Sequence, residues 1–145
     1  MYRIKIDRSR CIGCLMCVTS CCISHDTHDA RNRVVIDSET RPTPIFCRHC
    51  DLPECAITCM TGAMRKDEKT GYVRYDRDQC AHCFMCVMAC PYGVLKPDAI
   101  NNWEVMKCDF CVHRSEDGTG NPMCVEKCPM QAITLVEVGG SREAD

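Results

Sequence analysis

The residues of this chain best suited to chemistry are its cysteines, which number 17 among 145 residues. Sixteen of them fall into four sets of four with short, regular spacing. The first and third sets read Cys-x2-Cys-x2-Cys-x3-Cys, and the second and fourth read Cys-x2-Cys-x4-Cys-x3-Cys and Cys-x2-Cys-x12-Cys-x3-Cys. In chain order the sets are Cys11, Cys14, Cys17 and Cys21; Cys47, Cys50, Cys55 and Cys59; Cys80, Cys83, Cys86 and Cys90; and Cys108, Cys111, Cys124 and Cys128.

Such spacing fits a cubic iron-sulfur cluster better than a single metal ion. Three thiolates in seven residues can bind three iron corners of one cube, and the fourth cysteine then reaches a different cluster. A zinc site needs two separated pairs, and a Rieske centre needs two histidines on one iron. We therefore predict four 4Fe-4S clusters as cofactors, with the sixteen cysteines as their iron ligands. A zinc-structured interaction module is the alternative from another class.

An internal duplication supports this count. Six cysteines of the first two sets recur 69 residues later, whereas Cys47 and Cys50 recur at an offset of 61. The difference equals the extra length of the x12 spacer over the x4 spacer, so residues 112–123 contain an insertion in one copy. The two copies are expected to form equivalent sites.

The rest of the composition limits the alternatives. Leu, Ile, Val and Phe together number 27, too few for an ordinary apolar core, so metal binding and folding are expected to be coupled. The formal charge of -2 predicts no nucleic-acid partner. Residues 1–8 are charged throughout, unlike a secretory signal, and no long apolar run predicts membrane insertion. We expect a cytoplasmic protein whose thiols stay reduced.

The elements that position the cysteines are expected to be short. Residues 2–7 and 71–76 alternate as strands do, residues 63–75 resemble a hairpin, and residues 132–136 read as a closing strand. Residues 15–23 and 84–90 are predicted helices, the second ended by Pro91. The five histidines lack paired spacing and are expected in loops or at the surface. This predicts an α+β fold, with residues 1–138 as one domain and residues 139–145 as a flexible tail.

These motifs resemble the sixteen-cysteine polyferredoxins, the iron-sulfur subunits of anaerobic oxidoreductases. The resemblance covers residues 10–135, with residues 47–55 similar to the family's second motif and residues 107–111 to its fourth. It implies a duplicated bacterial-type ferredoxin fold in which the sets exchange their last cysteines. The implied ligands are Cys11, Cys14, Cys17 and Cys128 for cluster A; Cys108, Cys111, Cys124 and Cys21 for cluster B; Cys47, Cys50, Cys55 and Cys90 for cluster C; and Cys80, Cys83, Cys86 and Cys59 for cluster D.

A fully ligated 4Fe-4S cluster changes by one electron with little rearrangement, and no acid-base or nucleophilic site is evident, so we expect an electron-transfer protein and not an enzyme. The resemblance implies a catalytic partner, such as carbon monoxide dehydrogenase, formate dehydrogenase, hydrogenase, or a tungsten or molybdenum enzyme like aldehyde oxidoreductase. A ferredoxin or flavoprotein would be the second redox partner. A freely diffusing multi-cluster ferredoxin is an alternative, and self-association through the two ends is conceivable. The sequence leaves open the direction of electron flow and the role of Cys22.

Overall fold

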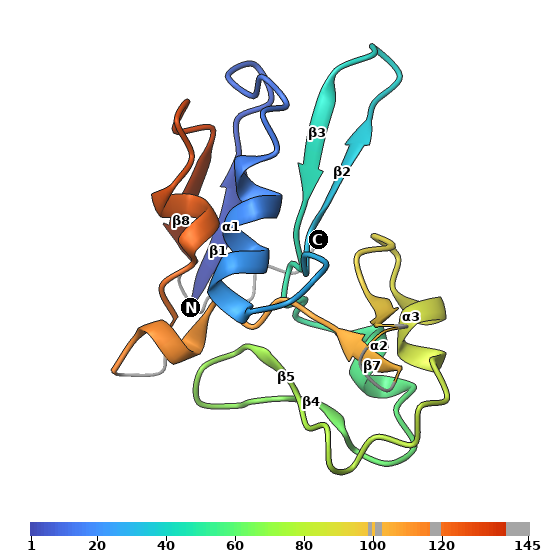
Figure 1. The fold of residues 1–145 in the computed structure, drawn as a ribbon. Coiled ribbons are helices and arrows are strands. Elements are labelled where there is room, and N and C mark those ends of the chain that lie inside the picture. The colour runs from blue at the N-terminus through green and yellow to red at the C-terminus, as the bar shows by residue number, and fades with distance from the viewer. Residues whose placement is uncertain (99, 101–102, 117–119, 139–145) are drawn as a thin grey trace.

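The computed structural model describes residues 1–98, 100, 103–116 and 120–138. Within these residues the chain forms short helices and strands, and the strands pair only as two-stranded antiparallel sheets (Figure 1). The strands are β1 (Tyr2–Ile6), β2 (Arg33–Ile36), β3 (Pro42–Ile45), β4 (Met64–Lys66), β5 (Val73–Tyr75), β6 (Lys96–Asp98), β7 (Glu104–Met106) and β8 (Ile133–Glu137). The helices are α1 (Met16–His25), α2 (Glu54–Ile57), α3 (Met85–Ala89) and α4 (Met123–Glu126), with a 3-10 turn η1 at Val112–Arg114. These elements confirm the predicted α+β class.

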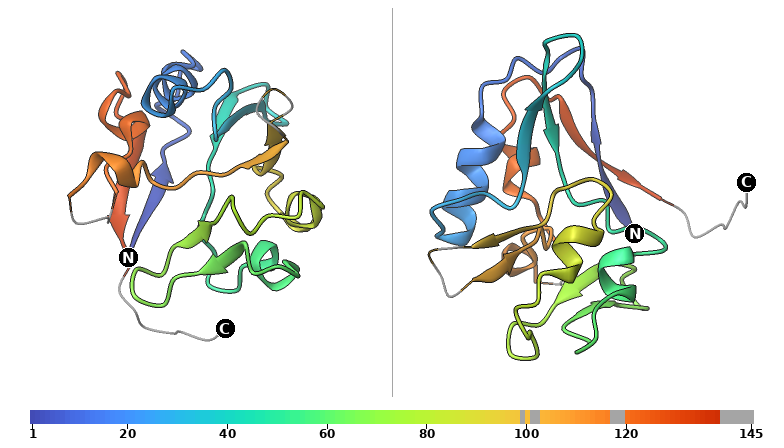
Figure 2. Two further views of the ribbon diagram at one scale, coloured as in Figure 1. Left: turned by 60° about the horizontal axis from the view of Figure 1, so that its bottom comes forward. Right: turned by 90° about the vertical axis from the view of Figure 1, so that its right-hand side faces the viewer.

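The two copies of the sequence repeat are interleaved in space. Each copy runs strand, helix, hairpin, helix, strand, but its first strand pairs with the last strand of the other copy: β1 with β8, and β5 with β4. The helices follow the same rule, because α1 packs on α4 and α2 packs on α3. The result is a first region built from β1, α1, α4, β8 and the β2–β3 hairpin, and a second built from α2, β4, β5, α3 and the β6–β7 hairpin (Figures 1 and 2).

The β1–β8 sheet shows why the terminal segments form strands. The alternation in β1 sets Ile4 opposite Leu135 and Ile6 opposite Ile133. Ile4 and Ile6 pack on the same cluster as the buried Ile133, while Lys5 on the alternate face is exposed. This alternation is the period-two pattern of a half-buried strand. The predictions for residues 2–7, 132–136 and the 63–75 hairpin are thereby confirmed within one or two residues.

Cysteine side chains supply much of the core of both regions. The first region centres on Cys17, Phe46, Cys124 and Ile133. The buried cluster of the second region consists of Met64, Val73, Leu95 and Val105, and five partly buried cysteines pack around it. The low aliphatic content of the sequence therefore corresponds to small apolar cores surrounded by thiols, as expected for a domain that metal binding stabilises.

The two helices that follow the Cys-x2-Cys-x2-Cys loops differ in length. Helix α1 continues to His25, two residues beyond the predicted end, whereas α3 stops at Ala89. Pro91 follows in the second copy, and a proline disfavours helical geometry in the residue before it. The equivalent position in the first copy is Cys22, which allows the helix to continue. The extra turn carries Ser24 and His25 over the fourth cysteine set.

Among the residues that the structure describes, no helix is long and apolar enough to cross a membrane. The predicted tail, residues 139–145, lies outside the described residues.

Candidate iron-sulfur sites

Three cysteine quartets each line a cavity, and each combines cysteines from two sequence sets. Quartet A, formed by Cys11, Cys14, Cys17 and Cys128, lines a cavity of about 380 Å³, its open mouth included. Cys11 and Cys14 come from the loop before α1, Cys17 lies in the first turn of α1, and Cys128 follows α4. The packing of α1 on α4 brings the two segments together. The walls between the cysteines are mostly apolar, because Val34, Pro44 and Ile133 contribute to them.

The second region contains two equivalent cavities of similar size. Quartet D lines one of about 330 Å³ and quartet C lines one of about 350 Å³. In quartet D, Cys59 follows α2 and lies beside the cysteines at the start of α3. Its place corresponds to that of Cys128 beside the cysteines at the start of α1 in quartet A. In quartet C, Cys90 at the end of α3 joins the loop that leads into α2. The members are Cys59, Cys80, Cys83 and Cys86 in quartet D, and Cys47, Cys50, Cys55 and Cys90 in quartet C.

The remaining quartet B is recognised from the mutual effects of its thiols. Burial, with the neighbouring thiolates of Cys111 and Cys21, raises the pKa of Cys124 to about 12. Burial also raises the pKa of Cys21 to about 11, with Cys111 contributing. The pKa of Cys108 lies well above its ordinary value because of burial first, then the thiolate of Cys47, with a smaller effect of Cys124. Cys17 of quartet A also contributes to the raised pKa of Cys124, so the thiols of quartet B have neighbours in both quartet A and quartet C.

Mutual repulsion is common to the quartets. Burial, together with Cys11 and Cys14, raises the pKa of Cys17 to about 11. Burial and the nearby Cys47 thiolate, partly opposed by Lys107, raise the pKa of Cys55 to about 12. Buried thiols that disfavour one another's ionisation require a compensating cation to be thiolates at neutral pH. Iron would supply that charge, so the donor set fits a cluster.

The backbone around the quartets also fits an anionic cluster. Leu15 and Phe84, the equivalent residues before α1 and α3, have φ of 59° and 58°, in the left-handed region. Two residues earlier, Gly13 and His82 have φ of 68° and 54°. Left-handed residues within loops turn successive N–H groups toward one side and form the concave nests that bind anions, iron-sulfur centres included. Non-glycine residues rarely adopt this conformation. Its recurrence at equivalent positions indicates that both sites need the same backbone shape.

Main-chain N–H groups already donate to several ligand sulfurs. The N–H of Met64 donates to Cys59 Sγ and that of Ala132 to Cys128 Sγ, both at 3.3 Å. These sulfurs are equivalent in the repeat. The N–H of Arg31 donates to Cys21 Sγ, also at 3.3 Å. Hydrogen bonds to sulfur are one of the means by which proteins set cluster potentials.

Quartet B has polar side chains beside its Cys111 sulfur. Ser24 Oγ donates to Cys111 Sγ at 3.4 Å, and His25 Nε2 lies 3.5 Å from the same sulfur. His25 also lies 3.4 Å from Asp109, which accepts a hydrogen bond from Arg31 at 2.8 Å. Burial, with a smaller effect of the Arg31 charge, lowers the pKa of His25 to about 4, so its ring is neutral at pH 7. The sequence patterns alone did not identify these side chains.

The contact between the two regions is centred on a buried aromatic group. His49 and Phe110, which are equivalent at the offset of 61, pack edge to face with centroids 4.7 Å apart. Tyr72 stacks on Phe110 at 4.8 Å. His49 is fully buried, and its Nδ1 accepts a hydrogen bond from the Val73 N–H at 3.0 Å. The expectation that all five histidines lie in loops or at the surface is therefore wrong for His49, which packs between the two copies, and for His25, which lies in α1 with its side chain 5% exposed.

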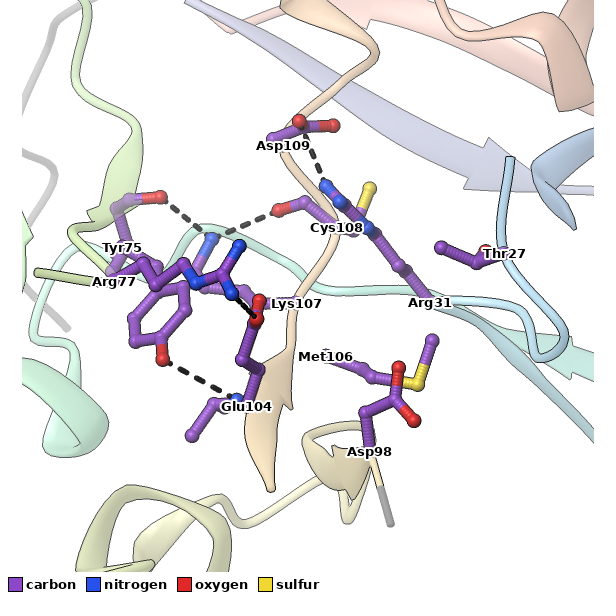
Figure 3. Close-up of a pocket in the computed structure, with 12 residues that line it drawn as sticks. Thr27, Arg31, Tyr75, Arg77, Asp98, Glu104, Met106, Lys107, Cys108 and Asp109 are labelled. Carbon is purple, nitrogen blue, oxygen red and sulfur yellow. Dashed lines mark hydrogen bonds and ion pairs between the residues drawn. The ribbon is translucent and has the colours of Figure 1, made fainter. Parts of the chain in front are cut away.

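A cavity of about 1150 Å³, its open mouth included, lies beside this contact and reaches Cys108 (Figure 3). Two ion pairs border it: Arg31 with Asp109 at 2.8 Å, and Arg77 with Glu104 at 2.7 Å. Lys107 extends into the same space, immediately before the first cysteine of the fourth set. Sequence reasoning did not single it out, although a charged residue just before a buried ligand was a usable signal.

Comparison with known proteins agrees with this geometry. A family described as a 4Fe-4S dicluster domain matches residues 38–138. The chain belongs to this family. It is 34% identical over 158 residues to the electron transport protein HydN of Escherichia coli strain K12, a match covering 92% of this chain and 87% of HydN.

Two further relatives are similar. An iron-sulfur protein of Rhodospirillum rubrum is 35% identical, with 97% of this chain and 85% of that protein covered. The probable anaerobic dimethyl sulfoxide reductase chain YnfG of Escherichia coli strain K12 is 36% identical, with 91% and 71% covered. These matches confirm the predicted resemblance to iron-sulfur electron-transfer subunits and the classification as a non-catalytic electron-transfer protein.

Proposed function

We propose that this chain relays single electrons through four 4Fe-4S clusters, held by quartets A, B, C and D, between a catalytic oxidoreductase subunit and a second redox partner. The observation that carries the proposal is the exchange of cysteines between sets. Cys128 lines the cavity of the first set, Cys59 that of the third and Cys90 that of the second. The proximity of Cys21, Cys111 and Cys124 supports the fourth exchange.

The relay would run in the order A, B, C, D. Thiolates of adjoining quartets affect one another: Cys17 of A acts on Cys124 of B, and Cys47 of C acts on Cys108 of B. Quartets C and D are linked through α2, which carries Cys55 and leads directly to Cys59. Cys14 and Cys83 are the exposed cysteines, one in each terminal quartet. Clusters A and D are therefore the sites where electrons would enter and leave.

Charge accumulates along such a relay. Each oxidised cluster with its four thiolates carries a formal charge of about -2. For clusters about 12 Å apart at an effective dielectric of about 20, each reduction disfavours the next by about 1.4 kcal/mol, or about 60 mV. We expect potentials in the negative half of the range known for such clusters.

The test is iron and acid-labile sulfide per chain in anaerobically purified protein, with absorption spectra before and after dithionite. About sixteen of each and a brown colour that bleaches on reduction would support the proposal. A value near eight would contradict the four-cluster assignment. Zinc without iron would favour the zinc-structured alternative, which the family match already disfavours.

For the catalytic partner we propose an anaerobic oxidoreductase with a buried active site, for example a molybdenum or tungsten enzyme, a hydrogenase, formate dehydrogenase or carbon monoxide dehydrogenase. A relative named as a dimethyl sulfoxide reductase chain supports this class. Co-purification of a catalytic subunit at fixed stoichiometry distinguishes a dedicated subunit from a freely diffusing ferredoxin. Isolation as a monomer under anaerobic, low-salt conditions would favour the freely diffusing form.

A further inference from the structure

Lys107 is a buried cation whose ammonium group donates to main-chain carbonyl groups. The residue is 4% exposed, and its Nζ donates to the carbonyl oxygens of Val73 at 2.6 Å and Cys108 at 2.9 Å (Figure 3). Among the described residues it forms no ion pair, while Glu104 and Asp109 in the same cavity are paired with arginines. A buried ammonium without a counter-charge is strongly unfavourable, even when carbonyl groups accept its hydrogen bonds.

The two carbonyl groups that Lys107 binds belong to the walls of two neighbouring cluster sites. Val73 lines the cavity of quartet C, and Cys108 is a member of quartet B. Lys107 Nζ is therefore held between the two sites, where its positive charge would favour negative charge in either.

The repeat shows that the motif does not require a lysine here. The equivalent position in the other copy, 61 residues earlier, is Phe46, which is 5% exposed and packs in the core of the first region. Both residues immediately precede the first cysteine of their set and both are buried. A charge is therefore present at only one of two equivalent positions.

We propose that Lys107 is the internal counter-charge of clusters B and C, so that it favours reduction of both and offsets the repulsion between them. This inference rests on the four-cluster relay. A fixed cation near a cluster stabilises the more negative, reduced state by Coulomb attraction, and burial strengthens the effect by excluding water and salt. Lys107 places a positive charge between the two clusters and does not bind iron.

The experiment compares K107M, K107Q and K107R with the unmodified protein by anaerobic redox titration followed by electron paramagnetic resonance. K66M is the matched control. Lys66 Nζ also donates to carbonyl groups near quartet C, those of Cys50 at 3.3 Å and Asp51 at 2.8 Å. Unlike Lys107, it is partly exposed and lies 3.6 Å from the Asp51 carboxylate. Iron is measured for every protein before its titration.

In K107M and K107Q, two of the four midpoint potentials should shift to more negative values while the other two move less. K107R and K66M should keep all four near their original values. Four unchanged potentials in K107M with full iron content would overturn the proposal and leave the relay itself intact. If K107M and K107Q lose iron but K107R does not, the charge is required and the proposal is supported. Loss of iron in all three variants would show that iron binding requires the shape of the lysine side chain, and would overturn the proposal.

Discussion

Sites B and C occupy equivalent places in the two copies of the repeat, but their surroundings differ. In site B, Ser24 and His25 lie within 3.5 Å of the Cys111 sulfur. The residues equivalent to Ser24 and His25 are Gly93 and Val94, neither of which can donate a side-chain hydrogen bond.

Cys22 and Pro91 account for much of this difference. With Cys22, α1 continues for a further turn and carries polar side chains to site B, whereas α3 ends before Pro91. The two sites thus share ligand geometry and differ in hydrogen bonding. In the proposed relay the duplicated backbone would hold the irons, and a few side chains around each cluster would adjust its potential independently. Substitution of a cysteine should therefore affect both sites alike. Substitution of the side chains around one cluster should change the potential of that site and not of the other.

Removal of all iron should have the largest effect and should not distinguish the sites. Because both cores are small and rich in cysteine, chelation under anaerobic conditions should unfold both regions. Far-ultraviolet circular dichroism should show loss of most of the native signal. A native-like spectrum in iron-free protein would mean that the cores suffice without metal.

Loss of single ligands should follow the exchanged pairing. C21A and C124A should each remove cluster B, leaving about twelve irons per chain, and the double variant should lose no more than either alone. C17A combined with C21A should leave about eight irons, because these cysteines belong to different clusters. Iron analysis decides between pairings: about eight irons in C21A/C124A and about twelve in C17A/C21A would show that the sets do not exchange cysteines.

Replacement of Cys22 by proline, which should shorten α1, should destabilise the protein more than the reciprocal replacement of Pro91 by alanine. Proline at position 22 removes a helical hydrogen bond and should destabilise the protein by about 3 kcal/mol. P91A, the reciprocal change, should alter the free energy of unfolding by less than about 1 kcal/mol. Denaturant unfolding of the anaerobic holoprotein measures both. If both variants changed the free energy of unfolding equally, the extra length of α1 would not be what distinguishes the first copy.

Removal of the Ser24 hydroxyl should lower the potential of cluster B alone. A hydrogen bond worth about 0.5–1 kcal/mol to the reduced state corresponds to about 20–40 mV for a one-electron couple. T19A is the control, since Thr19 on the same helix donates to the Leu15 carbonyl and contacts no cluster sulfur in the structure. Redox titration should show one shifted potential in S24A and none in T19A. Identical midpoint potentials in S24A and T19A would show that the Ser24 hydrogen bond does not set the potential of cluster B.

Replacement of Cys22 by alanine should have the smallest effect. Its thiol is half-buried and lines none of the cavities of quartets A, C and D. Alanine keeps the helix, so C22A should retain about sixteen irons and unchanged potentials. A loss of about four irons would identify Cys22 as a ligand.

The sequence by itself determined the cysteine sets, their duplication, the α+β class and four of the eight strands that the structure describes, namely β1, β4, β5 and β8. These follow from local spacing and period-two alternation, which operate over a few residues. It also predicted that thiols and metal would replace an aliphatic core. The hairpins β2–β3 and β6–β7 were not predicted, because Pro42, Pro44 and Pro97 argue against strands except at the edges that two-stranded sheets provide.

Only the tertiary structure decided which side chains surround each site. Lys107 contacts Val73, Ser24 contacts Cys111 and His49 packs on Phe110 through long-range contacts that the interleaving of the copies creates. Residues far apart in sequence meet there because the first strand of each copy pairs with the last strand of the other. Local sequence patterns carry no record of such contacts, whereas the cysteine sets, carried by short segments, can be read from spacing alone.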